Sequence, residues 1–356
     1  MYRPNYQITS QIARSLVRIE LVKEQIKGLP ITPSLLMSLR KSAKLSSTHY
    51  STKIEGNKLT QAQVEEVIVE TKHTKGRERD EKEVLGYYDA LDQVNLWATE
   101  AISVNQNHIQ RIHALVMGDK RVKFTAFRDG QNVIRDSSTG QIIYMPPEAK
   151  DVLGLVNELI DWIASSQVEN VPDPIRAAFT HYQFATIHPY YDGNGRTARL
   201  LTNLILHLSG YDLKGIYSLE EYYAQALDRY YAAITVGSSH NYYFGRAEAD
   251  ITNWIEYFCE GMANSFEKVR NKALESQTSQ ADQSKYLKQL DSRQKIVLQH
   301  YQKGDIVTSK DIQALLQIKP RNAAYILSKW IREGFFDLVD ESKKNRAFRI
   351  SNPRPN

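Results

Sequence analysis

The sequence is poor in cysteine and contains no long apolar run. Its 356 residues include one cysteine, Cys259, so an intramolecular disulfide is excluded, and no paired Cys/His spacing indicates structural zinc. The N-terminus has no apolar stretch of the signal-peptide type, and no uninterrupted apolar segment is long enough to span a bilayer. We therefore expect a reduced, cytoplasmic protein without membrane contact.

Net charge is also nearly absent from most of the chain. Residues 290–356 hold 13 Lys/Arg against 7 Asp/Glu, whereas the remaining residues hold 33 against 34. The formal net charge of +5 is therefore a property of the C-terminal segment. A basic excess confined to one end places any nucleic-acid partner there, and the chain length predicts two or more domains.

The first 272 residues have mainly the apolar spacing of helices. Thr32 and Pro33, for example, mark the start of a helix predicted over 33–44. One stretch differs, because Val133–Ile134 and Ile142–Tyr144 flank a Gly/Ser-containing turn, which predicts a β-hairpin. Taken alone, this hairpin is explained equally well by a surface element without function.

The C-terminal segment predicts a separate domain over 289–356, after a polar linker over 273–288 that is rich in Gln and Ser. Its apolar pattern predicts three helices followed by two strands, at 291–301, 309–316, 320–332, 335–339 and 347–350. Three helices and a hairpin with a basic tip are the arrangement of a winged helix-turn-helix. The predicted DNA contacts are Arg321, Lys329 and Lys343, although many winged helices bind proteins instead.

The segment His188-Pro-Tyr-Tyr-Asp-Gly-Asn-Gly-Arg-Thr-Ala-Arg199 lies between two predicted helices. Gly193 and Gly195 let the backbone approach an anion closely, and the start of the second helix presents unpaired N–H groups. Arg196 and Arg199 lie on one side of its first turn. Two guanidinium groups beside such a helix end favour a polyphosphate over a single carboxylate.

Two further residues of this segment have the chemistry of group transfer. Asp192 can hold a magnesium ion that bridges phosphate oxygens, and a neutral His188 can accept a proton from an attacking hydroxyl. Each element alone is commonly structural, since a Gly-x-Gly is usually a turn and paired arginines are usually solvated. Their combination within twelve residues favours a functional site.

This segment resembles the Fic family signature His-Pro-Phe-x-(Asp/Glu)-Gly-Asn-Gly-Arg-x-x-Arg at every position but one, where Tyr190 replaces Phe. The resemblance implies a Fic-type helical core over 101–272 and transfer of AMP from ATP to a protein Ser, Thr or Tyr hydroxyl, with Mg²⁺ as cofactor and pyrophosphate as the leaving group. It implies that His188 is the base and Asp192 the metal ligand. The implied ATP-binding residues are Gly193, Asn194, Gly195, Arg196, Thr197, Arg199 and Tyr231.

Gly195 favours AMP transfer over phosphorylation, because the related Doc-type kinases carry Lys at that position. These residues do not distinguish AMP from other nucleotides or from phosphocholine. The stretch from Phe127 to Pro147 resembles the family's flap, a hairpin that holds the target chain by strand addition, here through Val133 and Ile134. Family members often dimerise, so a homodimer is a further expectation.

A second resemblance lies in the N-terminal helical region, 1–100. Ser51-Thr-Lys-Ile-Glu55-Gly56 is similar to the family's inhibitory motif, (Ser/Thr)-x-x-x-Glu-(Gly/Asn), and is expected on a helix near 46–56. The resemblance implies that Ser51 and Glu55 are inhibitory and that Glu55 forms a bidentate pair with Arg199 at the γ-phosphate position. The alternative is an ordinary surface helix, because six-residue patterns occur by chance.

Two functions follow from these observations. The first is an autoinhibited protein adenylyltransferase that modifies a protein partner and itself, with an accessory DNA- or protein-binding domain. The alternative is a nucleotide-sensing DNA-binding regulator without transferase activity. The presence of His188 favours the first, because a sensor does not need a base. The expected fold is mainly α, with a Fic-type core, a hairpin flap and a C-terminal winged helix-turn-helix.

Overall fold

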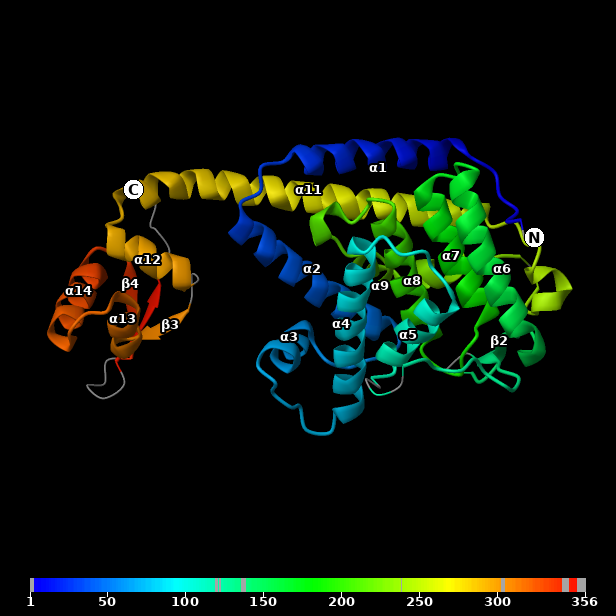
Figure 1. Ribbon diagram of the computed structural model, residues 1–356, viewed down its shortest axis with the longest axis horizontal. Helices are drawn as coiled ribbons and strands as arrows, with labels where there is room; N and C mark the ends of the chain where they lie inside the picture. Colours follow the sequence, from blue (N-terminus) through cyan, green and yellow to red (C-terminus); the bar gives the residue numbers. More distant parts are fainter. Residues whose placement is uncertain are drawn as a thin grey trace. The chain divides into compact units, whose positions relative to one another are not determined.

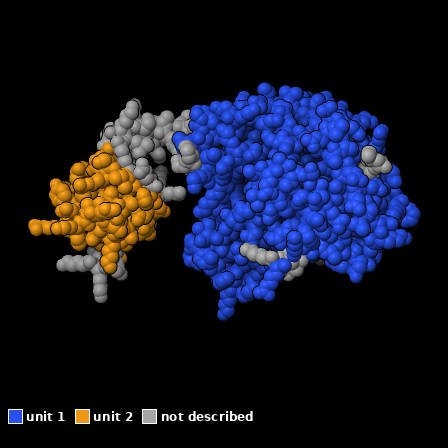
Figure 2. Space-filling model, viewed as in Figure 1, with its two compact units in different colours: residues 1–272 blue, residues 273–356 orange. Residues whose placement is uncertain are grey.

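The computed structural model describes residues 3–118, 121, 123–135, 139–237, 239–301, 305–340 and 346–350. The chain divides into two compact units, residues 1–272 and 273–356 (Figure 2). Both units are built mainly from helices, with a short sheet in each. No helix among the described residues combines the length and apolar character needed to cross a membrane.

In the described residues of the first unit, ten α-helices precede residue 252 (Figure 1). Their bounds are α1 (Ser10–Gly28), α2 (Pro33–Ile54), α3 (Gln61–Val69), α4 (Glu78–Thr99), α5 (Gln106–Val116), α6 (Ala149–Val168), α7 (Asp173–Ile187), α8 (Asn194–Leu208), α9 (Leu219–Gln225) and α10 (Leu227–Ile234). The hairpin strands are β1 (Ile134–Arg135) and β2 (Ile142–Tyr144), paired antiparallel. A 3₁₀ turn (Leu213–Gly215) and a π turn (Tyr242–Arg246) precede α11 (Thr252–Gln289).

Helices α7 and α8 form the centre of the first unit, and almost all their residues are buried (Figure 1). Some of their buried polar groups bond to one another across the two helices. His181 of α7 bonds Thr202 of α8 at 3.1 Å and the Tyr230 hydroxyl at 2.9 Å. These contacts join the middle of α7 to the middle of α8, the two helices that flank the site loop.

The loop between α7 and α8 is set by local backbone chemistry. Pro189 disfavours the α conformation for the residue before it, and His188 ends α7 in the left-handed region at φ 51°. Gly193 begins α8 at φ 75°, a value that glycine adopts without strain. The predicted break between the two helices is therefore present where Pro189 and Gly193 require it.

Helix α2 is longer than the sequence predicts, because one continuous helix replaces the helix expected over 33–44 and the separate one near 46–56. The hydroxyls of Thr48 and Thr52 each donate to the carbonyl four residues earlier, at 2.9 Å. These bonds accommodate polar residues that otherwise disfavour a helix. The helix ends at Ile54, so Glu55 is its C-cap.

In the second unit, the described residues form α12 (Ser292–His300), β3 (Ile306–Thr308), α13 (Ser309–Leu316), α14 (Pro320–Arg332), β4 (Phe336–Asp340) and β5 (Ala347–Ile350). The antiparallel sheet has the order β3-β5-β4. Strand β3 was not predicted, because its partner β5 lies about forty residues away and the strand has only three residues. Trp330, Val307 and Phe348 lie in the core.

The segment predicted as a helix end and linker over 273–288 is helical throughout, as part of α11, which ends at Gln289. The segment contains no Gly or Pro, and its Ala, Glu, Gln, Lys and Leu residues have high helix propensity. In the first unit, α11 lies beside α1 (Figure 1), and Arg18 pairs with Glu267 at 2.7 Å.

Candidate active site

A cavity of about 500 Å³ brings together three regions that are distant in the sequence. The end of α2 contributes Glu55, the α7–α8 loop region contributes His188 and Gly195, and the hairpin contributes Ile134. Tyr231 of α10 also lines the cavity and is half exposed, with its hydroxyl 3.4 Å from the Ile54 carbonyl. The remaining lining residues are Arg135, Ile143, Tyr144, Ala185, Thr186, Tyr230, Ile234, Thr235 and Arg246.

His188 has the protonation state that a general base requires. Burial lowers its pKa to about 4, a shift that the hydrogen bond to the Ala185 carbonyl and the charge of Glu55 only partly oppose. The ring is therefore neutral at pH 7. Because Nδ1 lies 3.2 Å from the Ala185 carbonyl, Nδ1 carries the proton and donates it there. The Nε2 lone pair is then available to accept a proton.

The first two turns of α8 contain buried donors that have no hydrogen-bond partner within the part of the chain that the structure describes. They are Arg196 Nε, Arg196 Nη1, Thr197 Oγ1 and Arg199 Nη1. Unpaired buried donors are costly, and a native structure needs a reason to keep them. A cluster of such donors at a helix N-terminus matches a polyphosphate ligand.

Asn194 is placed differently from the other predicted phosphate-binding residues. Its amide nitrogen donates to the Tyr190 carbonyl at 2.8 Å, and its amide oxygen accepts from the Tyr190 N–H at 3.0 Å. The side chain is thus occupied in bracing the loop. Its contribution to anion binding is therefore limited to the loop shape and to its backbone N–H.

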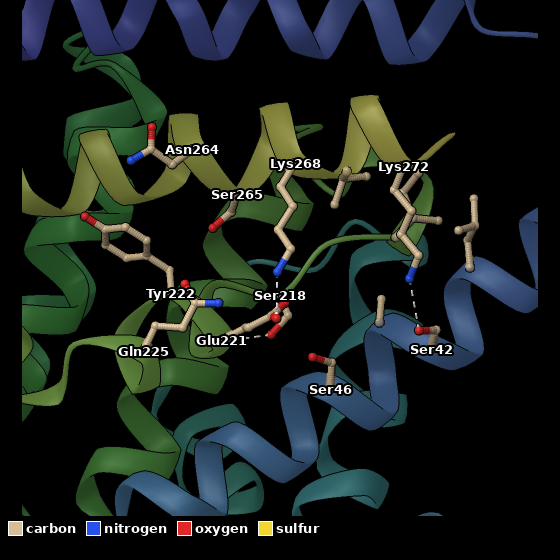
Figure 3. Close-up of a pocket in the computed structure, with 14 residues that line it drawn as sticks. Ser42, Ser46, Ser218, Glu221, Tyr222, Gln225, Asn264, Ser265, Lys268 and Lys272 are labelled. Carbon is tan, nitrogen blue, oxygen red and sulfur yellow. Dashed lines mark hydrogen bonds and ion pairs between the residues drawn. The ribbon is translucent and has the colours of Figure 1, made fainter. Parts of the chain in front are cut away.

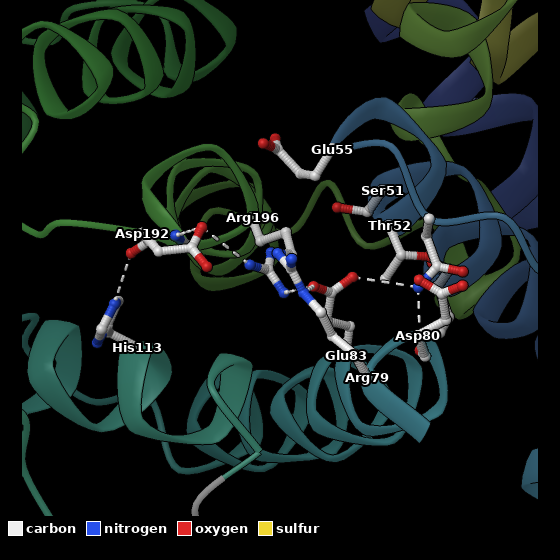
Figure 4. Close-up of polar contacts among 12 residues, drawn as sticks. Ser51, Thr52, Glu55, Arg79, Asp80, Glu83, His113, Asp192 and Arg196 are labelled. Atoms are coloured by element: carbon white, nitrogen blue, oxygen red, sulfur yellow. Dashed lines mark hydrogen bonds and ion pairs between the residues drawn. The ribbon is translucent and has the colours of Figure 1, made fainter. Parts of the chain in front are cut away.

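Asp192 and Arg196 form a charged group with Glu83 of α4 (Figure 4). Arg196 Nη2 lies 3.3 Å from Asp192 Oδ1, and Nη1 lies 3.9 Å from Glu83 Oε1. The Asp192 side chain is 53% exposed, which leaves it accessible to a metal. Among the described residues, no three His, Cys, Asp or Glu side chains cluster as a metal site. One accessible carboxylate fits Mg²⁺, which binds through one or two carboxylates plus phosphates and water.

Glu55 contacts Arg199 as the inhibitory motif implies, but through one oxygen. Arg199 Nη2 donates to Glu55 Oε1 at 2.8 Å and to the Ser51 carbonyl at 2.9 Å, while Nε donates to the Ser51 hydroxyl at 2.8 Å. The expected bidentate pair is therefore wrong, because the Ser51 hydroxyl takes Nε and Nη1 has no hydrogen-bond partner among the described residues. Burial lowers the pKa of Arg199, but the charges of Glu55, Tyr230 and Tyr87 outweigh this and the net shift is upward.

Gly195 is required by the position of Glu55. A Cβ atom at this residue would lie 2.2 Å from Glu55 Oε1 and 3.2 Å from Arg199 Nη1. The first distance is far inside van der Waals contact, so any side chain here would displace the carboxylate. The glycine of the signature thus permits the Glu55–Arg199 contact as well as close approach of an anion.

Two supporting residues were not identified as site residues from the sequence. His113 stacks on Tyr190 with ring centroids 3.5 Å apart, and its Nε2–H donates to the Asp192 carbonyl at 2.9 Å. Buried Arg128 donates to the His188 carbonyl at 2.9 Å and also to the Pro147 carbonyl, joining the loop to the flap stretch. Spacing alone could not reveal either contact, because the partners are 60 to 79 residues away.

The remaining predicted residues lie in the flap and in the second unit. Ile134 belongs to β1, whereas Val133 precedes the strand and is half-buried. Arg321 is exposed in the first turn of α14. Lys329 lies 3.9 Å from Asp291 and 3.5 Å from Glu333. Lys343 lies outside the described residues.

Comparisons with known proteins agree with this arrangement. Residues 103–206 match the model of the Fic/DOC family. The chain is 28% identical over 200 residues to protein adenylyltransferase Fic of Drosophila grimshawi, a match covering 56% of this chain and 40% of that protein. It is 32% identical over 203 residues to protein adenylyltransferase Fic of Nematostella vectensis, covering 55% of this chain and 45% of that protein. The chain thus spans less than half the length of these curated relatives.

A solved structure shares the fold. The crystal structure of a Fic family protein from Desulfovibrio desulfuricans G20 superposes with a TM-score of 0.67 at 21% identity, over 100% of both chains. The family match covers the site loop, α7 and most of α8. The chain therefore contains a Fic/DOC family domain over residues 103–206.

Proposed function

We propose that this protein is an autoinhibited protein adenylyltransferase, which transfers AMP from ATP to a Ser, Thr or Tyr hydroxyl of a protein, including itself. The observation that supports the proposal most is the group of unpaired buried donors on Arg196, Thr197 and Arg199, beside the cavity that contains His188. The names of the curated relatives support the same reaction.

In the proposed reaction, Arg196 and the N–H groups of the first turn of α8 bind the phosphates of ATP. Asp192 would hold Mg²⁺, which would supply positive charge to offset that of the phosphates. His188 Nε2 accepts the proton of the target hydroxyl. The hydroxyl oxygen then bonds to the α-phosphorus, the bond from that phosphorus to the bridging oxygen breaks, and pyrophosphate leaves.

Inhibition is proposed to result from the contact between Glu55 and Arg199. The Glu55 carboxylate lies against Arg199 at 2.8 Å and so takes the position proposed for the γ-phosphate. ATP then binds with its α-phosphate out of line with the hydroxyl, and positioning dominates catalysis of phosphoryl-type transfer. Any change that frees Arg199 is expected to activate the protein.

The target protein is proposed to bind as an added strand beside the hairpin. The outer edge of β2 is partly occupied, because the Ile143 carbonyl accepts from His240 and Met145 pairs with Asn241. The added strand is therefore proposed to pair with the outer edge of β1, beside Val133 and Ile134. The Tyr144 hydroxyl anchors the hairpin by donating to the Thr186 carbonyl at 2.9 Å, two residues before His188. A target chain on the hairpin would thus lie beside the base.

The second unit is proposed to be a winged helix-turn-helix that binds DNA. Its order of helix, strand, two helices and two strands supports this assignment, as does the basic excess of residues 290–356. Arg321 is the strongest remaining phosphate contact, because Lys329 already lies beside two carboxylates. DNA binding by this unit is also part of the alternative function, a nucleotide-sensing regulator without transferase activity.

Incubation with ATP labelled at the α-phosphate, with Mg²⁺, separates the two functions. A transferase incorporates label into itself or into added protein, and incorporation is abolished by His188→Ala. A regulator incorporates no label, even as the Glu55→Gly variant. Intact-mass analysis of the same samples identifies the group that is transferred.

A further inference from the structure

A buried carboxylate lies next to the proposed inhibitory contact. Glu220 of α9 is 1% exposed and accepts four hydrogen bonds. Oε1 accepts from the Tyr87 hydroxyl at 3.0 Å and from Asn203 Nδ2 at 2.8 Å. Oε2 accepts from the Ser47 hydroxyl at 2.8 Å and from the Ser218 hydroxyl at 3.0 Å. None of the four donors carries a charge, so the buried carboxyl group depends on all four hydrogen bonds.

The donors belong to different elements of the first unit. Ser47 is on α2, Tyr87 on α4 and Asn203 on α8, while Ser218 directly precedes α9. Glu220 therefore joins the helix that ends in Glu55 to the helix that contains Arg199. A buried carboxylate with fully paired oxygens fixes the groups around it, because loss of any donor leaves charge uncompensated.

The α2 donor is in register with the inhibitory residues. Ser47, Ser51 and Glu55 follow one another at intervals of four, which places them along one face of α2. Ser51 and Glu55 contact Arg199, and Ser47 contacts Glu220 one turn earlier. A shift of α2 that broke the Ser47 bond would therefore also move Ser51 and Glu55.

On another face, α2 is not closely packed. A crevice of about 150 Å³ separates it from α11. Ser42 and Ser46 of α2 lie opposite Lys268 and Lys272 of α11, and Lys272 reaches the Ser42 hydroxyl at 3.4 Å (Figure 3). Toward α11, α2 therefore has few dispersion contacts, whereas it packs directly on α9, the helix that contains Glu220.

We propose that Glu220 is a positioning residue, which holds Ser47 and thereby sets the distance between Glu55 and Arg199. The inference rests on the proposed function, because it gives Glu220 and Ser47 a role in the inhibited state of the transferase. Neither residue touches the cavity that contains His188. Their effect on activity must therefore pass through the positions of α2 and α8, which both bond to Glu220.

Ser47→Ala tests this inference, because it removes the α2 donor and leaves Glu220 with Tyr87, Asn203 and Ser218. Ser46→Ala is the matched control, since it makes the same change at the neighbouring, half-buried position without touching Glu220. Hydrogen exchange of the amides from 48 to 55 is the readout that does not require activity. It is expected to accelerate about tenfold in Ser47→Ala, the effect of losing one hydrogen bond to a charged group, and to stay at the parental rate in Ser46→Ala.

Self-modification with ATP is the second readout. Ser47→Ala is expected to increase it by a similar factor, up to the level of Glu55→Gly, because the population with free Arg199 grows. In a chain that already carries Glu55→Gly, Ser47→Ala should not increase self-modification further. If Ser47→Ala only destabilised the protein, it would lower the activity of that chain. Unchanged exchange, or unchanged activity in a chain that Glu55→Gly does activate, overturns the role of Glu220. If the Glu55→Gly chain is no more active than the parent, autoinhibition is refuted instead. The hydrogen-exchange result then tests by itself whether the bond between Ser47 and Glu220 holds α2 in place.

Discussion

Replacing Glu55 by glycine perturbs one contact in a defined way. Glu55 Oε1 accepts from Arg199 Nη2 at 2.8 Å, and the Arg199 side chain is 1% exposed while that of Glu55 is 31% exposed. Arg199 keeps its two contacts with Ser51 after the change. The substitution therefore removes the competing carboxylate and leaves the guanidinium group in place for a phosphate.

The size of the effect follows from the strength of that bond. A hydrogen bond between charged groups contributes ~1.5–3 kcal/mol, and the partial exposure of Glu55 favours the lower end. About 1.5 kcal/mol corresponds to roughly a tenfold gain in productive ATP binding. Without ATP the same loss should destabilise the protein by about 1.5 kcal/mol, because Arg199 has lost a charged hydrogen-bond partner that is itself partly exposed.

The assay is the initial rate of α-phosphate incorporation over a range of ATP concentrations, with thermal unfolding measured in parallel. Glu55→Gly should be about ten times more active at low ATP and should unfold at a lower temperature than the parent. Glu55→Gln keeps the shape and one acceptor oxygen, so it should fall between the two. Combination with Arg199→Ala should remove the gain. A Glu55→Gly variant with parental rates at every ATP concentration refutes the assignment of Glu55 as the inhibitor.

Four further outcomes are expected. His188→Ala should lower transfer by ~10²–10⁴ with ATP binding retained, as measured by labelled incorporation and calorimetry; full activity removes His188 from the reaction. Burial lowers the pKa of His113 and of His188 to about 4 and that of His181 to about 3, so the unfolded chain binds more protons between pH ~6.5 and ~4. Unfolding free energy should therefore fall as the pH drops through this window, by about 1.4 kcal/mol per unit of pKa difference for each histidine; denaturant curves independent of pH contradict this. Gly195→Ala should lower the melting temperature more in the parent than in Glu55→Gly, because its Cβ would meet Glu55 Oε1 at 2.2 Å. Equal decreases in melting temperature in the two chains would mean that Glu55 does not lie against Gly195. Arg321→Ala should weaken binding of the full chain to duplex DNA more than Lys329→Ala, with affinity falling as salt rises; absence of binding at low salt argues against a DNA partner.

The parts of the site that follow from local chemistry could be predicted from the sequence. Pro189 and Gly193 determine where α7 ends and α8 begins, so His188 and the two arginines could be placed on either side of one loop. The Glu55–Arg199 contact could be expected from the inhibitory motif, although the role of Ser51 in replacing the second carboxylate oxygen could not.

Contacts between distant segments could not be predicted. Glu83 lies 113 residues before Arg196, and Glu220 lies 173 residues after Ser47. Single glutamates of this kind carry no pattern that distinguishes them from surface residues. The uninterrupted helix α2 was missed for a local reason, since its Ser and Thr residues suggest a break unless the hydroxyls bond back to the helix.

The burial of Cys259 in α11 has a practical consequence. Its side chain is 0% exposed and burial raises the pKa of its thiol to about 12, so thiol reagents should leave it unmodified in the folded protein. The chain is thus ready for labelling with one introduced cysteine and no further engineering. Lys53 is exposed, two residues before Glu55, and a fluorophore attached through Lys53→Cys would report movement of the end of α2 when ATP binds, in solution and in real time.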